Sequence, residues 1–192
     1  DVLDSWSKFL EQLEEKTGER KATLIMHTDP YDHEGPNLTV TSEMLNIQDN
    51  VFFSTERLDF DKMNILYNVS DFSLNISYAE GFGLPTLEGM MSGTPMIAVK
   101  TGAIDVECKT LVGSQQVPYI YEDYCTNESV ASAIMKLYDM SPSKRTKLSK
   151  KCLEYARTQF SLRKTVDDWD MTLQDLCDTW KEKYKRWECS SY

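Results

Sequence analysis

The sequence predicts an α/β fold in which a parallel β-sheet is covered by helices on both faces and followed by a helical C-terminal tail. Short apolar runs typical of buried strands alternate with helical patterns over residues 1–125. Strands separated by helices pair in parallel through right-handed crossovers. Residues 126–192 carry only helical patterns. We therefore expect one domain over residues 1–192, with any ligand bound at the carboxyl ends of the strands.

The first predicted helix starts at Val2, because apolar residues recur at three- and four-residue steps as far as Leu13. It should end at Gly18, a residue suited to a helix C-terminus. Four short apolar runs predict the strands, at residues 22–28, 50–54, 71–77 and 95–99. Helices are expected between them, at residues 40–45, at residues 61–68 and from about residue 84 onward.

Three helices are expected in the tail. Asn127 is the candidate N-cap of the first, Ser141 with the following proline opens the second, and Ser161 caps the last. An apolar stripe that includes Trp169 and Trp180 runs along this last helix. The simpler interpretation is that the stripe covers the chain's own core. The alternative is that it packs on a second domain.

Composition excludes several classes of protein. The formal net charge of −10 argues against nucleic acid or an anionic membrane surface as the main partner, because both attract concentrated positive charge. No apolar run is long enough to span a membrane. The five cysteines are an odd number without C-x-x-C spacing, which favours neither a zinc site nor a disulfide framework. We expect reduced thiols and a cytoplasmic location.

A glycine-rich turn between two glutamates is the main candidate site. Gly81 and Gly83 lie between the third predicted strand and a helix that begins near Leu84, with a proline in its first turn. Glycines let the backbone approach a ligand, and a helix N-terminus attracts anions such as phosphates. Glu80 stands before the turn, and Glu88 follows one helical turn after Leu84. Carboxylates accept hydrogen bonds from hydroxyls, so this spacing suits a nucleotide sugar.

The same pattern has a purely structural alternative. Leu87, Met90 and Met91 share a helix face that should pack on the sheet, which leaves Glu88 on a neighbouring strip. Glu88 is then a solvated helix residue, and the G-F-G segment is a tight turn between strand and helix. Spacing alone does not choose between these interpretations.

The segment "AEGFGLPTLEGMMSGTPMIAV" resembles the E-x7-E signature of retaining glycosyltransferases with the two-domain GT-B architecture, especially glycosyltransferase family 4. "NVFFS" and "LYNVSDFSLNIS" are similar to the neighbouring segments of that family. The resemblance implies a Rossmann-like domain, the C-terminal, donor-binding half of such an enzyme. It also implies transfer of a sugar from a nucleoside-diphosphate sugar with retention of configuration, with no cofactor and no required metal.

The resemblance implies a donor site built from three groups of residues. Glu80 is the catalytic candidate and contacts hydroxyls of the donor sugar, and Glu88 binds the ribose. Backbone N–H groups of the turn hold sugar and diphosphate, and the loop after the second strand lies near the base. The implied donor-binding residues are Gly81, Phe82, Gly83, Leu84, Glu88, Arg57 and Leu58.

The chain departs from the family pattern at its start. The strand that precedes the first helix, with an arginine and a lysine that neutralise the diphosphate, has no counterpart here, nor does the N-terminal acceptor domain. We expect this half alone to be inactive, and the missing parts to come from upstream residues or from a partner chain. Peripheral membrane association through the acceptor half stays open, and the acceptor is unidentified.

Two other functions compete with glycosyl transfer. An epimerase of the same architecture would act on a nucleotide sugar without an acceptor, but it should place extra His and Asp residues at the site. Only His27 and His33 are present. The other alternative is a non-catalytic interaction domain that kept the fold, which would bind no nucleotide.

Overall fold

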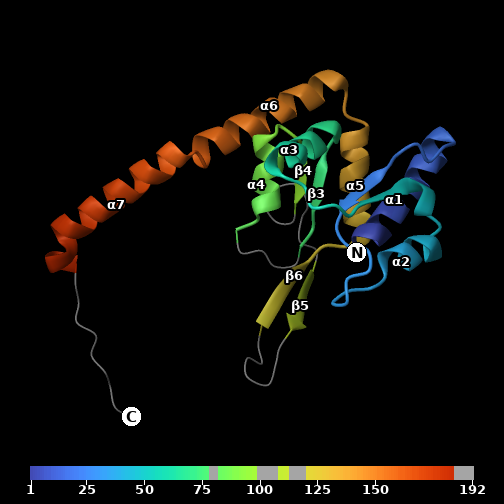
Figure 1. Ribbon diagram of the computed structural model, residues 1–192, viewed down its shortest axis with the longest axis horizontal. Helices are drawn as coiled ribbons and strands as arrows, with labels where there is room; N and C mark the ends of the chain where they lie inside the picture. The colour runs from blue at the N-terminus through green and yellow to red at the C-terminus, as the bar shows by residue number, and fades with distance from the viewer. Residues whose placement is uncertain (78–81, 99–107, 113–119, 184–192) are drawn as a thin grey trace, which may run out of the picture.

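The computed structural model describes residues 1–77, 82–98, 108–112 and 120–183 (Figure 1). The helices are α1 (Val2–Thr17), α2 (Leu38–Met44), α3 (Phe60–Val69), α4 (Leu84–Met91), α5 (Asn127–Tyr138), α6 (Pro142–Gln159) and α7 (Leu162–Lys183), with a 3-10 turn, η1 (Gln48–Asn50). The strands are β1 (Leu24–His27), β2 (Val51–Ser54), β3 (Ser73–Asn75), β4 (Met96–Ala98), β5 (Cys108–Val112) and β6 (Ile120–Tyr124).

Parallel pairing between alternating strands and helices confirms the predicted α/β fold. β1 pairs in parallel with β2, and Leu24 lies opposite Val51. β3 pairs in parallel with β4, and Ser73 lies opposite Met96. Within the described residues these are two separate two-stranded sheets. A third pair, between β5 and β6, is antiparallel and was not predicted.

Most helix ends lie at the capping residues that the sequence predicts. Gly18 ends α1 in the left-handed conformation, with φ of 79°, and its N–H bonds to the Glu14 carbonyl oxygen at 2.8 Å. The side chain of Ser161 accepts a hydrogen bond from the Lys164 N–H, as expected of a cap. The prediction for α5 was wrong by one residue. Thr126 is its N-cap, and its side chain accepts from the Ser129 N–H.

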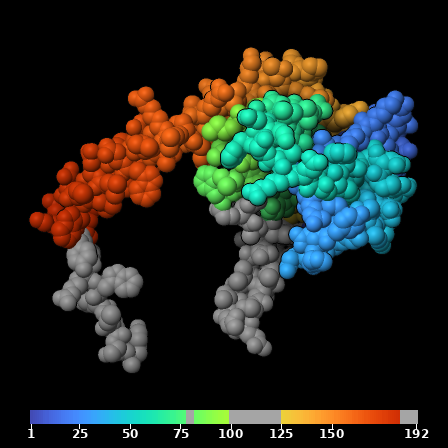
Figure 2. All heavy atoms as spheres, viewed as in Figure 1, coloured from blue at the N-terminus to red at the C-terminus, as the bar shows by residue number. Residues whose placement is uncertain are grey.

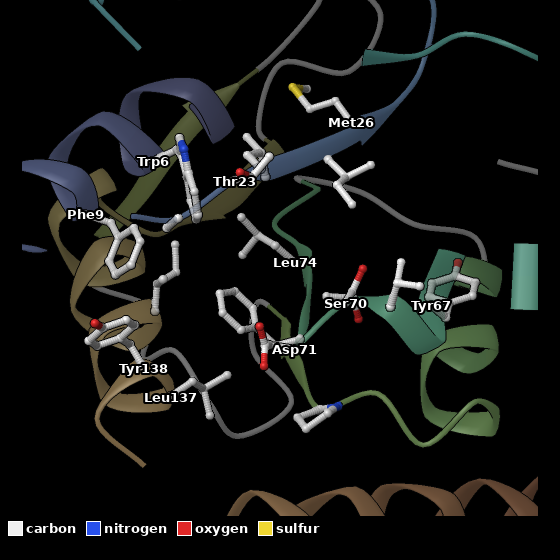
Figure 3. Close-up of a pocket in the computed structure, with 18 of the residues that line it drawn as sticks. Trp6, Phe9, Thr23, Met26, Tyr67, Ser70, Asp71, Leu74, Leu137 and Tyr138 are labelled. Carbon is white, nitrogen blue, oxygen red and sulfur yellow. The ribbon is translucent and has the colours of Figure 1, made fainter. Parts of the chain in front are cut away.

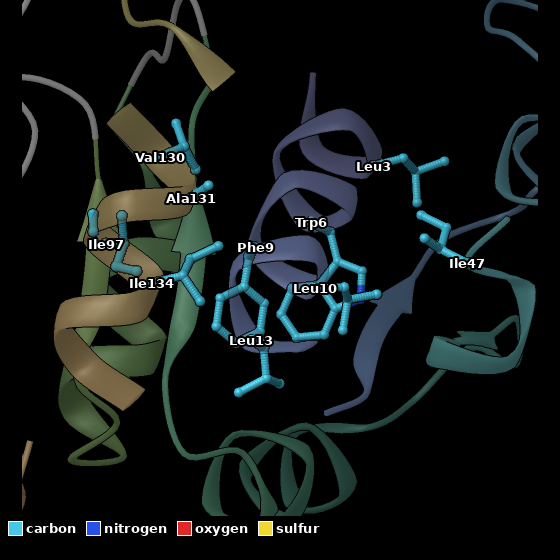
Figure 4. Close-up of a cluster of buried hydrophobic side chains, with 11 residues drawn as sticks. Leu3, Trp6, Phe9, Leu10, Leu13, Ile47, Ile97, Val130, Ala131 and Ile134 are labelled. Carbon is cyan, nitrogen blue, oxygen red and sulfur yellow. The ribbon is translucent and has the colours of Figure 1, made fainter. Parts of the chain in front are cut away.

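The hydrophobic core forms where α1 lies beside α5 (Figure 4). Phe9, Leu10 and Leu13 are fully buried on α1, and Val130 and Ile134 are fully buried on α5. Their three- and four-residue spacing is the pattern that predicted an amphipathic α1. Side chains from the parallel strands pack against the same cluster, so both sheets share one core.

Polar side chains tie the flanks of this core together. The Ser5 hydroxyl donates to the side-chain oxygen of Asn127 at 3.0 Å, so Asn127 links α5 to α1 instead of capping its own helix. The ring nitrogen of Trp6 donates to the Asn50 carbonyl oxygen at 3.2 Å, just before β2. These bonds satisfy polar groups at the edge of an apolar cluster.

The last helix stands away from this core. Figures 1 and 2 show α7 running out from the rest of the molecule. None of its residues is buried, and Trp169 and Trp180 are 63% and 51% exposed. The interpretation that the stripe covers the chain's own core is therefore wrong for these two tryptophans. None of the described helices is long and apolar enough to cross a membrane.

Candidate functional site

The glycine turn leads into α4 as the sequence predicts. Gly83 has φ of 75° and ψ of 47°, a left-handed conformation that favours glycine. Its carbonyl oxygen accepts hydrogen bonds from the N–H groups of Thr86 and Leu87, at 3.0 Å and 3.2 Å. Pro85 lies in the first turn, where a missing N–H costs nothing. The helix therefore begins at the expected residue, with the positive end of its dipole at the turn.

Asn75 joins the carboxyl end of β3 to the start of α4. Its amide nitrogen donates to the Thr86 hydroxyl at 2.9 Å. Its amide oxygen accepts from the hydroxyl of Ser77 at 2.8 Å and from the N–H of Ser77 at 3.2 Å. Asn75 was not among the predicted site residues. The signal that could have found it is a polar amide inside an otherwise apolar strand.

Glu88 is held in place by a tyrosine from the neighbouring helix. The Tyr67 hydroxyl, on α3, lies 3.2 Å from Oε2 of Glu88 and donates to it. The same hydroxyl lies 3.3 Å from the carbonyl oxygen of Pro85. Glu88 is half-buried. The Glu88 carboxylate is therefore not freely solvated and has a defined position one turn from the helix start, whereas its role in binding a ligand stays a prediction.

The environment of Tyr67 favours its protonated form. Burial raises the pKa of Tyr67 to about 12, and the charge of Glu88 and the hydrogen bond to it act in the same direction. At neutral pH the phenol therefore stays a donor, and Glu88 keeps this partner.

We expect Tyr67→Phe to lower the free energy of unfolding by about 0.5–1.5 kcal/mol near pH 7, the scale of one partly exposed hydrogen bond. The tyrosine pKa is raised in the folded state, from 10.0 to about 12. Its contribution should therefore be complete below pH 10.0 and should fade as the pH rises towards 12. Urea denaturation of both proteins between pH 7 and pH 11 measures this difference. A difference that grows above pH 10.0 would contradict the assignment.

Gly89 brings α4 close to the strands. A Cβ atom at this position would lie 3.0 Å from the Ser73 hydroxyl oxygen and 3.1 Å from the Met96 methyl carbon. Gly89 is the buried residue of α4, whereas Leu87, Met90 and Met91 are half-buried. The closest approach to the sheet is thus made by a glycine and not by the predicted apolar side chains.

Aromatic side chains at the C-terminal end of α6 contact Phe82, the residue before Gly83. The ring of Phe82 meets the ring of Phe160 edge-on, with centroids 6.1 Å apart, and Phe160 in turn contacts Tyr155 at 5.9 Å. Phe82 is still 66% exposed. The turn is therefore flanked by an aromatic surface that remains accessible.

The predicted site residues fall into three groups. Glu80 and Gly81 lie outside the described residues. Phe82, Gly83, Leu84 and Glu88 lie together at the start of α4. Arg57 and Leu58 lie on the loop between β2 and α3, where Arg57 is exposed and Leu58 is half-buried.

His27 lies at the carboxyl end of β1. Its Nδ1 atom lies 3.0 Å from the Ser54 hydroxyl, so the side chains that end β1 and β2 contact each other. This contact supports a structural role for His27 at the carboxyl edge of the strands.

Comparisons with known proteins point to one family. The model of the family described as glycosyl transferases group 1 matches residues 32–159. A search of curated protein sequences found no significant match. Among solved structures, sucrose-phosphate synthase from Thermosynechococcus elongatus is similar, with a TM-score of 0.58 and 20% identity over 93% of this chain and 44% of that chain.

A second solved structure has the same degree of similarity. It is the C-terminal domain of the glycosyl transferase group 1 family protein LpcC from Francisella tularensis, with a TM-score of 0.58 and 20% identity, over 83% of this chain and 79% of that chain. Both likenesses show the fold, which is that of a GT-B C-terminal domain. The chain spans less than half of the synthase chain.

Proposed function

Since this chain belongs to the glycosyl transferases group 1 family, we propose that it is the donor-binding half of a retaining GT-B glycosyltransferase. The donor is a nucleoside-diphosphate sugar, and the reaction transfers its sugar to an acceptor. The observation that carries the proposal is the start of α4, where a left-handed Gly83 opens a helix N-terminus one turn from the half-buried Glu88.

The donor would lie along the first turn of α4. Its diphosphate would lie at the N-terminus of the helix, where the dipole and the backbone N–H groups favour negative charge. Glu88, oriented by Tyr67 at 3.2 Å, would accept hydrogen bonds from the ribose hydroxyls. The exposed Phe82 offers an apolar surface beside the turn, and Arg57 and Leu58 would contact the base.

Glu80 is the proposed catalytic residue, and its role would be to contact hydroxyls of the transferred sugar. Charge that develops on the leaving nucleoside diphosphate would be stabilised by the helix dipole and by basic residues, so the proposed reaction requires no metal. Departure of the leaving group and attack by the acceptor occur on the same face of the sugar when the configuration is retained.

The remaining parts of the site are proposed to lie outside this chain. An acceptor-binding domain, in the same protein or in a partner chain, would face the turn and supply the acceptor. The exposed stripe of α7, with Trp169 and Trp180, is the surface that would pack on that domain. Residues 1–192 would then form one nucleotide-sugar-binding domain, and activity would require both halves.

Nucleotide binding tests the proposal directly. We expect one of UDP, GDP and ADP to bind the full-length protein in calorimetric titration. Glu88→Ala should weaken that binding by about 1–3 kcal/mol, or roughly 5- to 150-fold in Kd, because a hydrogen bond to a charged group is lost.

A matched control separates the site from general effects of charge. Glu154→Ala removes an exposed carboxylate on α6 and should leave Kd unchanged. If none of the three nucleotides binds the folded protein, the glycine turn is only a connection between strand and helix. A non-catalytic interaction domain that kept the fold then becomes the better explanation.

A further inference from the structure

Positive charge is concentrated on α6, although the chain as a whole is acidic. The helix has six of the 21 Lys and Arg residues of the chain but one of its 31 Asp and Glu residues. It therefore carries five excess positive charges in a chain whose formal net charge is −10. A net charge summed over the whole chain hides a local excess of this kind, which can attract an anionic partner.

One face of α6 packs on the domain, and the opposite face is exposed. Cys152 is half-buried and Ala156 is buried on the inner face, and α6 lies beside α4 (Figure 1). Arg145 also points inward. Its guanidinium lies 3.2 Å from the Asp71 carboxylate and donates to the Tyr138 carbonyl oxygen at 2.7 Å, beside the cavity drawn in Figure 3. Arg145 therefore ties α6 to the fold and is not available to a partner.

The other cations of α6 lie on its exposed side. This basic face consists of Lys144, Lys147, Lys150, Lys151 and Arg157. Lys144, Lys147 and Lys151 follow one another at three- and four-residue steps, so they share one stripe of the helix. Within the described residues, none of the five cations forms an ion pair.

Cations on other helices have acidic partners. On α7, Nζ of Lys164 lies 2.7 Å from Oδ2 of Asp168, one helical turn away. On α1, Nζ of Lys8 lies 2.8 Å from Oε1 of Glu128. The chain thus pairs lysines with carboxylates elsewhere, and the unpaired charge of the basic face is a particular property of α6.

The basic face opposes the stability of its own helix. Lys147 has Lys144, Lys150 and Lys151 as neighbours three or four residues away, and like charges at these spacings destabilise a helix. Lys144 also lies in the first turn, where the positive end of the helix dipole disfavours a cation, and that turn has no acidic residue. Features that work against local stability are expected at functional sites. A role in binding accounts for this arrangement, whereas helix stability does not.

We propose that the basic face of α6 is a docking surface for a membrane rich in anionic phospholipids. Clusters of about four to eight Lys and Arg residues on an amphipathic helix are typical of attraction to anionic lipid head groups. Tyr155 continues the stripe four residues after Lys151 and is 54% exposed. An aromatic side chain therefore lies next to the cations, where it can enter the head-group region of a membrane.

The type of cation favours a membrane over a protein partner. Four of the five residues in the basic face are lysines. Lysine is depleted at protein–protein interfaces, whereas arginine is enriched there because its planar group makes specific paired hydrogen bonds. A lysine is a compact charge on a flexible stem, which suits a layer of lipid head groups with no fixed arrangement.

Vesicle flotation tests the basic face in the full-length protein. The vesicles contain phosphatidylcholine alone or phosphatidylcholine mixed with phosphatidylserine. We expect tighter binding to the mixed vesicles, and added salt should weaken it. A variant that combines Lys144→Gln, Lys147→Gln and Lys151→Gln should lower the partition coefficient on the mixed vesicles by about tenfold or more, because each charge near the membrane surface contributes to binding.

A matched control removes the same number of exposed lysines from other elements. It combines Lys21→Gln before β1, Lys62→Gln on α3 and Lys136→Gln on α5, and it should change the partition coefficient far less. Urea denaturation should show that the basic-face variant is at least as stable as the natural protein, because repulsion between like charges is removed. A less stable variant would show instead that these lysines serve the fold.

Three further results would overturn the proposal. One is equal binding of the natural protein to the two kinds of vesicle. Another is equal binding of the two triple variants to the mixed vesicles, which would assign the attraction to overall charge. The third is binding to double-stranded DNA, lost in the basic-face variant, without binding to the mixed vesicles; nucleic acid would then be the partner. None of these readouts depends on nucleotide binding, so a failure here leaves the proposed function standing.

Discussion

Leu10→Ala is expected to lower the free energy of unfolding by about 2–5 kcal/mol, the usual cost of removing a large buried aliphatic side chain. Leu10 is 0% exposed and belongs to the cluster between α1 and α5 (Figure 4). The loss includes both the transfer of the removed methyl groups and the cavity that they leave. A domain of this size is stabilised by about 5–15 kcal/mol, so this one change could unfold a large fraction of the protein at 37 °C.

Chemical denaturation measures the effect, and the chain contains a matched control. Leu162→Ala makes the same substitution at a residue that is 80% exposed at the start of α7. It should change the free energy of unfolding by no more than about 0.5 kcal/mol. Equal effects of the two substitutions would mean that the packing of α1 on α5 is not the main core of the domain.

Parts of the fold that are set by residues close together in the sequence could be predicted, and parts that are set by tertiary packing could not. Val2–Thr17 was predictable because its apolar spacing and the glycine at its end are local features. The parallel strands were predictable because they are buried apolar runs between helices. β5 and β6 were missed. Charged residues such as Lys109, Glu122 and Asp123 interrupt their apolar character, and an antiparallel pair need not be buried on both faces.

The candidate site also contains features that local sequence predicts and contacts that only the tertiary fold determines. Gly83 and the start of α4 follow from adjacent glycines and a proline. The hydrogen bond from Tyr67 to Glu88 could not be predicted, because it joins residues 21 positions apart on two helices whose packing is set by the tertiary fold. Asn75 is predictable in one respect and not in the other. Its strand was predicted, but its bond to Thr86 depends on where α4 lies.

The second large effect on stability is expected at Gly89, where α4 packs closely on β3 and β4. Gly89→Val should destabilise the domain by about 1–3 kcal/mol, because added methyl groups have no room in a well-packed interior. The first added carbon already lies 3.0 Å from the Ser73 hydroxyl oxygen, and the two further methyl groups of valine would extend the clash. α4 would have to move away from β3 and β4, and Glu88 and the helix start would move with it.

Gly89→Ala separates this clash from helix propensity. Alanine favours a helix interior over glycine by about 1 kcal/mol. Its single Cβ would be tight only against the ends of the Ser73 and Met96 side chains, which can shift, and it would make an ordinary contact of 3.5 Å with the Tyr67 ring. We therefore expect alanine to be tolerated far better than valine, when both are measured by urea denaturation.

A double-mutant cycle identifies the contact that is responsible. Met96→Ala removes the methyl group that would lie 3.1 Å from a Cβ atom at residue 89, and it should relieve part of the cost of Gly89→Val. The coupling between two residues in contact is typically about 0.5–3 kcal/mol. Additive effects would show that Met96 is not the obstacle. A fully stable Gly89→Val protein would show that α4 does not lie against β3 and β4 at this point, and the position of Glu88 relative to the helix start would then have to be revised.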